Sequence, residues 1–231
     1  MTIKSAKLKN TGEKLSGNAF FYVLILSIIN VIVDIISSTA MNEVTNWWLY
    51  QITMTLYVLT MPLLAAAWVS YTYVVIHRGE SINTLKKPVS FIMAPYFVYA
   101  LIGLSNPFTG LFFRLSANME YSRGILFMPL GVGFIMLYSL IGVIMVWFNR
   151  HKIFPRSNIL LMASFFISTA ISIWVQLANP GWLIINACYA IVYVWCDMTL
   201  EEQRRKVLYE KIKKQNLQLE EIAQKAEQAA Q

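Results

Sequence analysis

The side chains best suited to chemistry gather in one connector, residues 106–124, which reads NPFTGLFFRLSANMEYSRG. It contains charges of both signs, an amide and hydroxyl groups, with Phe108, Phe112 and Phe113 as apolar surfaces beside them. Such a set is suited to binding a small polar or amphipathic molecule. The candidate ligand-binding residues of the connector are Asn106, Thr109, Arg114, Glu120, Tyr121 and Arg123.

Catalytic chemistry is not predicted for this chain. The sequence shows no paired acids, no cluster of metal ligands and no nucleophile beside a base at a recognisable spacing. We therefore expect no catalytic residues, no metal and no cofactor, and we do not expect the chain to be an enzyme.

The composition places the connector in a membrane protein. Of the 231 residues, 57% are hydrophobic and only 13% are charged, whereas about a quarter of a soluble domain is charged. The mean hydropathy is +0.53. The net charge of +7 could suggest nucleic acid as a partner, but no binding module is recognisable, and basic loops between apolar spans indicate membrane orientation instead.

Six apolar runs approach the length of about 20 residues that a helix needs to cross a bilayer. The sequence therefore predicts an all-α integral membrane bundle with the lipid bilayer as its first partner. The glycines of Gly131-Val-Gly133 lie inside one run, where they indicate close helix packing. The six predicted spans are Gly17 to Thr39, Trp47 to Ile76, Pro88 to Leu104, Gly124 to Phe148, Asn158 to Leu177 and Pro180 to Cys196.

The distribution of cations predicts the orientation of the spans. Ten lysines and arginines fall before the first span, between the second and third, and between the fourth and fifth, whereas the opposite connectors hold only Arg114 and Arg123. The positive-inside rule then places both chain ends in the cytoplasm and residues 106–124 outside. The ten are Lys4, Lys7, Lys9, Lys14, Arg78, Lys86, Lys87, Arg150, Lys152 and Arg156.

Polar side chains inside the spans lie at the depth of the connector. Each is costly against lipid and is expected to turn inward to a partner, water or a ligand. Either they satisfy one another, or they complete an outer pocket in which Asp34 contacts a cation or hydroxyl and Arg114 or Arg123 contacts an anion. The candidate ligand-binding residues of the spans are Asn30, Asp34, Gln51, Gln176 and Asn186.

The chain becomes charged and helix-favouring after Asp197. Its apolar residues recur at alternating spacings of three and four, the pattern of a coiled-coil seam with one polar position. We expect a tail at 1–16, a transmembrane domain at 17–197 and a dimeric cytoplasmic coil at 198–231; a helix lying on the inner leaflet is the alternative. The seam consists of Leu208, Ile212, Gln215, Leu219, Ile222, Ala226 and Ala229.

Several motifs together resemble a known family. VDIISS at 33–38, NPFTGLFF at 106–113, YSRG at 121–124 and WVQLANPG at 174–181 are similar to the multi-helix membrane input regions of bacterial sensor histidine kinases and GGDEF diguanylate cyclases. EIAQKAEQAAQ at 221–231 resembles the linker that leads into the phosphoacceptor helix of many sensor kinases. Relatives often carry one further N-terminal helix.

The resemblance implies a multi-pass receptor module in the bacterial cytoplasmic membrane. It would detect a small ligand at the outer side and transmit through a homodimeric coil to an effector domain beyond residue 231, a histidine kinase before a diguanylate cyclase. A six-helix solute-binding or transport protein is the alternative, but a transporter has no evident use for a long terminal coil.

Overall fold

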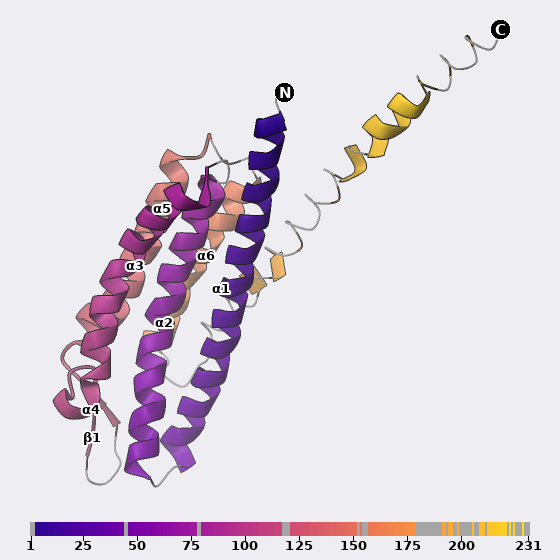
Figure 1. Cartoon of the computed structure of the whole chain (residues 1–231). Coiled ribbons are helices and arrows are strands. Elements are labelled where there is room, and N and C mark those ends of the chain that lie inside the picture. The colour runs from indigo at the N-terminus through magenta and orange to yellow at the C-terminus, as the bar shows by residue number, and fades with distance from the viewer. Residues whose placement is uncertain are drawn as a thin grey trace. The chain divides into compact units, whose positions relative to one another are not determined.

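The computed structural model of the chain forms two compact units, Met1–Ala190 and Ile191–Gln231 (Figure 1). The structure describes residues 3–43, 46–77, 80–116, 121–151, 153 and 157–178 of the first unit. In the second unit it describes helical residues 191–192, 194–195, 198, 205, 208–210, 212–220, 222, 224 and 228.

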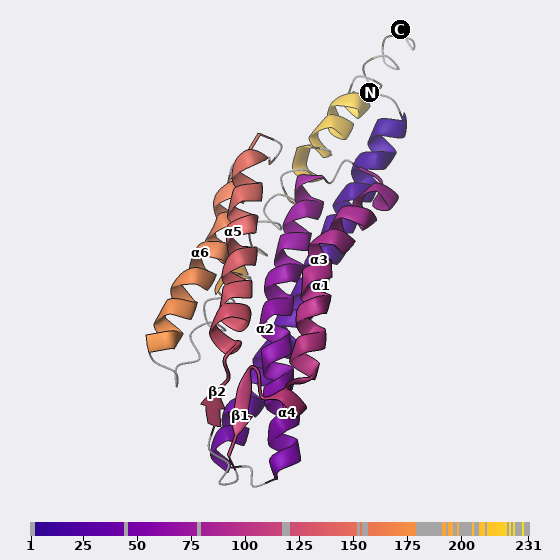
Figure 2. The ribbon, with the colours of Figure 1, turned by 90° about the vertical axis from the view of Figure 1, so that its left-hand side faces the viewer.

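The first unit is a bundle of antiparallel helices with a small connector between its third and fourth long helices (Figure 2). The sequence predicts that the third span begins at Pro88. In the structure, α3 continues through Pro88 and begins six residues earlier, at Ile82. The elements are α1 (Ile3–Glu43), α2 (Trp47–Ile76), α3 (Ile82–Leu104), α4 (Asn106–Thr109), β1 (Phe113–Leu115), β2 (Tyr121–Arg123), the π-helix η1 (Phe127–Val132), α5 (Gly133–Phe148) and α6 (Ser157–Ala178).

Among the described residues, four helical segments are long and apolar enough to cross a membrane, which indicates a membrane protein. The fifth predicted span lies within α6, and Ala163–Val175 is its apolar stretch among the described residues. Most of the sixth lies outside the described residues, so a count of six stays a prediction. The four segments are Gly17–Thr39, Trp47–Ile76, Ile82–Leu104 and Phe127–Phe148.

Helix α1 shows the inside-out polarity of a helix in lipid. Its buried face includes the polar residues Ser27, Asn30, Asp34 and Ser37, which recur at spacings of three and four. Its exposed surface is largely apolar. A helix in a soluble protein would bury its apolar residues and expose its polar ones. The opposite distribution on α1 fits a surrounding bilayer. The exposed set is Phe21, Tyr22, Ile25, Ile28, Ile29, Ile32, Ile35 and Ile36.

Helix α2 is the central element, in contact with α1, α3 and α5. Two contacts define its register with α1. The rings of Phe20 and Tyr71 lie 5.5 Å apart. Asn30 follows Phe20 by ten positions in α1, and Met61 precedes Tyr71 by ten positions in α2. The Nδ2 atom of Asn30 lies 3.5 Å from the sulfur of Met61. The two helices are therefore antiparallel and in step over this length, which places Asp34 level with Tyr57.

The proline inside α2 is compensated by a tyrosine of a neighbouring helix. Pro62 has no N–H for the carbonyl of Val58, four residues earlier, and Tyr99 of α3 donates its hydroxyl to that oxygen at 2.9 Å. Lipid offers no replacement donor, so such groups must be satisfied inside the protein. In α3, Tyr138 of α5 donates to the carbonyl of Ile92, which is next to the Phe91 carbonyl that Pro95 leaves without its helical donor.

Helices α5 and α6 pack closely at Gly142. A Cβ atom there would lie 1.9 Å from the ring of Phe166, which is buried. The close packing predicted for Gly131 and Gly133 is wrong, because a Cβ would meet Phe112 at 4.0 Å and a backbone oxygen at 3.6 Å, which are ordinary contacts. Whether a glycine is needed for close helix packing depends on the side chain that faces it from the neighbouring helix. A single sequence does not show which side chain that is.

The structure is mostly helical, as the sequence predicted, and the connector adds one short hairpin. Strands β1 and β2 pair antiparallel, with Phe113 opposite Arg123, Arg114 opposite Ser122 and Leu115 opposite Tyr121. The following span begins at Phe127 and not at Gly124, because the N–H groups of Gly124 and Leu126 donate back to the carbonyls of Phe112 and Leu111, each at 2.8 Å. Each strand has three residues, which is too short for a periodicity to be visible in sequence.

Replacing Gly142 by alanine should destabilise the bundle. The new methyl group must displace Phe166, and overpacking of this kind costs about 1–3 kcal/mol. Thermal unfolding in detergent measures the loss, and Gly131→Ala is the matched control. The double variant Gly142→Ala/Phe166→Leu should recover part of the stability. Equal melting temperatures for the two single variants would show that the α5–α6 contact does not depend on Gly142.

Candidate ligand-binding site

Asn106 holds the connector together from inside. Its side-chain oxygen accepts hydrogen bonds from the N–H groups of Phe112 at 2.6 Å and Phe113 at 3.2 Å. Its side-chain amide donates to the carbonyl of Phe113 at 3.2 Å. The residue is 1% exposed, so its polar atoms serve the backbone and are not presented to a ligand. Asn106 thus organises the connector, and its predicted role in ligand binding stays a prediction.

A glycine turn brings the strand back to Asn106. Gly110 ends α4 in the left-handed conformation, with φ 62°, and its N–H donates to the carbonyl of Asn106 at 2.8 Å. Residues other than glycine adopt this conformation at a cost. Thr109 is exposed and donates its hydroxyl to the carbonyl of Ser105 at 3.1 Å, which is also a local bond.

The hairpin separates the two arginines of the connector. Residues directly opposite in an antiparallel pair share a face, and neighbours along a strand alternate. Arg114 therefore shares a face with Ser122, and Arg123 lies on the other face with Phe113. The Nε of Arg114 donates to the carbonyl of Gly110 at 3.2 Å. The guanidinium carbon of Arg123 lies 5.2 Å from the ring centre of Phe127.

Tyr121 connects the hairpin with the start of α2. Its ring stacks on Phe113, with centres 6.3 Å apart. Burial raises the pKa of the Tyr121 phenol, Arg123 opposes this by lowering it, and Tyr50 of α2 raises it further. The phenol is therefore neutral at physiological pH and keeps its donor hydrogen.

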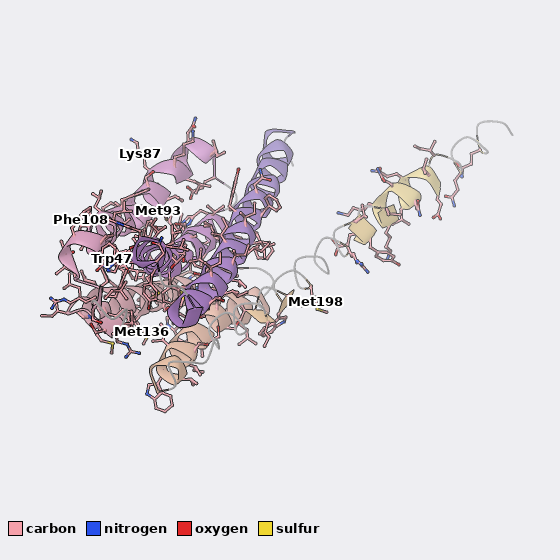
Figure 3. All side chains as sticks on the ribbon, turned by 90° about the horizontal axis from the view of Figure 1, so that it is seen from below. Trp47, Lys87, Met93, Phe108, Met136 and Met198 are labelled. Carbon is pink, nitrogen blue, oxygen red and sulfur yellow. The ribbon has the colours of Figure 1, made fainter. Side chains whose placement is uncertain are left out.

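The phenylalanines of the connector do not form one apolar wall. Phe112 and Phe113 are 0% exposed and belong to the core of the connector. Phe108, a residue of α4, is 87% exposed and lies at the periphery of the bundle (Figure 3). Of the three aromatic surfaces predicted from the sequence, only that of Phe108 is open to a ligand or to lipid.

The polar residues of the spans are buried, as the sequence predicted. Asn30 is 0% exposed and Asp34 and Gln51 are each 4% exposed. Asn30 and Asp34 share one face of α1, and Gln51 lies in the first turns of α2, at the end of the bundle that carries the connector (Figure 1). Glu120, Asn186 and the side chain of Gln176 lie outside the described residues.

Sequence reasoning missed a set of buried hydroxyl groups. Thr55, one turn after Gln51, is buried, and neither its hydroxyl nor the Gln51 side-chain oxygen has a hydrogen-bond partner among the described residues. The spacing of four from Gln51 was the available signal. Within the same part of the chain, Thr72, Ser139 and Ser172 also have hydroxyl groups without a partner. Such groups normally bind water or a ligand.

In the described ranges no group of three or more His, Cys, Asp or Glu residues could hold a metal ion. Comparison of the chain with protein-family models, with curated proteins and with solved structures gives no match.

Asn106→Ala should loosen the connector selectively. The change leaves two buried N–H groups and one carbonyl without their partner, which costs about 2 kcal/mol or more. Thermal unfolding in detergent and limited proteolysis should show a lower melting temperature and faster cleavage near the hairpin. Thr109→Ala, which removes an exposed local bond, is the control. Equal losses in both variants would contradict the organising role of Asn106.

Proposed function

We propose that the chain is the membrane input module of a bacterial signalling receptor. It lies in the cytoplasmic membrane, receives a small ligand at its outer connector and passes the signal through a homodimeric C-terminal coil. The output is a histidine kinase or, as the second candidate, a diguanylate cyclase. This choice of output rests on the resemblance of the sequence motifs to such input regions.

The observation that carries the proposal is the apolar seam of the second unit. Leu208, Ile212, Leu219 and Ile222 lie in helical segments at heptad spacing and are all exposed in the single chain. Burying a side chain of this size contributes about 1.5–3 kcal/mol. An isolated helix of this length is marginal in water, so a parallel partner supplies both its stability and a route for the signal.

The coil register also assigns a role to Gln215. It is exposed and occupies a d position between Ile212 and Leu219. A single polar residue in a seam lowers stability but selects one register and one oligomeric state. Ala226 and Ala229, the last predicted seam positions, lie outside the described residues.

The input side of the proposal rests on polarity within the first unit. Asp34 and Asn30 form a buried polar face on α1, and polar side chains at this depth commonly belong to functional sites. Because the hairpin places Arg114 and Arg123 on opposite faces, an anionic group of the ligand contacts one of them and not both. Arg114 is the better candidate, since Arg123 lies against Phe127.

The same polar face of α1 would also suit a solute transporter, which is the alternative function. The seam distinguishes the two readings, because transport requires no regular apolar stripe on a terminal helix. An experiment on signal output therefore separates them better than a ligand-binding assay.

The proposal can be tested without knowing the stimulus. Residues 1–231 are joined to the catalytic region of a bacterial histidine kinase, and one to seven alanines are inserted at the junction. Each inserted residue rotates the following helix by about 100°. Autophosphorylation should vary with the insertion and return near its starting level at seven residues, one full heptad.

The matched controls report pairing of the coil. A cysteine replacing Ile222 in the seam should form disulfide-linked dimers, whereas one replacing Lys214 outside it should not. Kinase activity that is independent of insertion length, together with crosslinking at both positions, would reject the receptor function and leave the transporter.

The polar face of α1 gives a second expectation in the same chimera. Asp34→Asn removes the charge while keeping size and hydrogen bonding, and should change basal autophosphorylation several-fold if this face takes part in coupling. Ile35→Val, on the exposed apolar side of the same helix, is the control. Unchanged activity in both variants, at equal expression, would assign Asp34 to packing alone.

A further inference from the structure

Tyr99 of α3 lies between the connector and the centre of α2. Its ring centre is 5.2 Å from that of Phe112 in the connector and 5.0 Å from that of Phe134 at the start of α5. Its hydroxyl donates to the carbonyl of Val58 at 2.9 Å, and the residue is 3% exposed. One side chain thus touches three separate elements.

The Val58 carbonyl that Tyr99 binds lacks its usual donor within α2. Pro62 supplies no N–H at the position four residues after Val58, and its ring crowds that carbonyl. A helix bends most easily at such a point. The next carbonyl, that of Leu59, accepts a second, longer bond of 3.3 Å from Tyr96. Its usual donor, the N–H of Leu63, is not removed by the proline.

We propose that Tyr99 is a latch that couples the connector to a proline hinge in α2. While Phe112 holds the Tyr99 ring, the hydroxyl satisfies the Val58 carbonyl and keeps α2 in its present form. A displacement of Phe112 moves the ring, frees the carbonyl and favours a different bend at Pro62. Because α2 contacts α1, α3 and α5, that bend reaches most of the bundle.

The connector is built to transmit such a displacement. Phe112 is fully buried, and its N–H is held by Asn106 at 2.6 Å, so movement of the hairpin carries the Phe112 ring with it. The role of the latch in signalling rests on the receptor function proposed above. The latch itself requires neither a stimulus nor an effector and can be measured on the chain alone.

A double-mutant cycle between Tyr99→Phe and Pro62→Ala tests the latch. The first change removes only the hydroxyl, and the second gives residue 62 an N–H for the Val58 carbonyl. In the parent chain, Tyr99→Phe should lower the melting temperature in detergent by about 2–4 °C. In the Pro62→Ala background the shift should be less than half as large, because the carbonyl keeps a partner.

Tyr96→Phe is the matched control, since the Leu59 carbonyl does not depend on Pro62. Its smaller shift should be the same in both backgrounds. If Pro62→Ala expresses poorly, Pro62→Leu provides the same N–H. A Tyr99→Phe shift that is equal in both backgrounds overturns the latch.

The signalling role has a separate readout in the kinase chimera. Tyr99→Phe and Phe112→Leu should both change basal autophosphorylation, and Tyr96→Phe should change it less. If the Tyr99→Phe shift in melting temperature depends on Pro62 but kinase activity is unchanged in Tyr99→Phe and Phe112→Leu, the signalling role of the latch is overturned. In that case the receptor function is judged by the heptad insertions, which do not involve Tyr99, so the two failures are distinguishable.

Discussion

The arrangement of the first unit depends on one constraint, that every backbone carbonyl in the membrane needs a donor from within the protein. Pro62 and Pro95 each remove one donor from a span. Tyrosines of α3 and α5 donate to carbonyls at or next to these breaks, and so fix α3 against α2 and α5 against α3. In water the same carbonyls would be hydrated, and the tyrosines would add little to the order of the helices.

The connector follows the same rule outside the spans. An irregular segment has no regular backbone hydrogen bonds. The side chain of Asn106 supplies them by accepting from the N–H groups of Phe112 and Phe113 and donating to the carbonyl of Phe113. The short hairpin completes the pairing. The described part of the connector is therefore held by its own hydrogen bonds, and Arg114 and Phe108 are exposed on it.

The sequence predicted the elements that depend on composition. Apolar length located four spans, and the cost of polar groups in lipid correctly predicted that Asn30, Asp34 and Gln51 are buried. It failed where the outcome depends on a partner from another helix. Gly142 is needed because Phe166 faces it, and Asn106 is occupied because the backbone of Phe112 and Phe113 returns to it. The spacing of residues in one sequence contains neither fact.

The buried polar groups of the bundle lie within a mostly apolar core. Beside the many weak apolar contacts of that core, the interior contains a few directional hydrogen bonds, each either made or broken. Breaking one leaves a costly group in lipid, so the helices settle into another arrangement that satisfies it. At Pro62 the bending point of α2 and a polar contact coincide, because the carbonyl that the proline leaves without a helical donor is the one that Tyr99 binds. A change of bend at this point must therefore break or remake that one hydrogen bond.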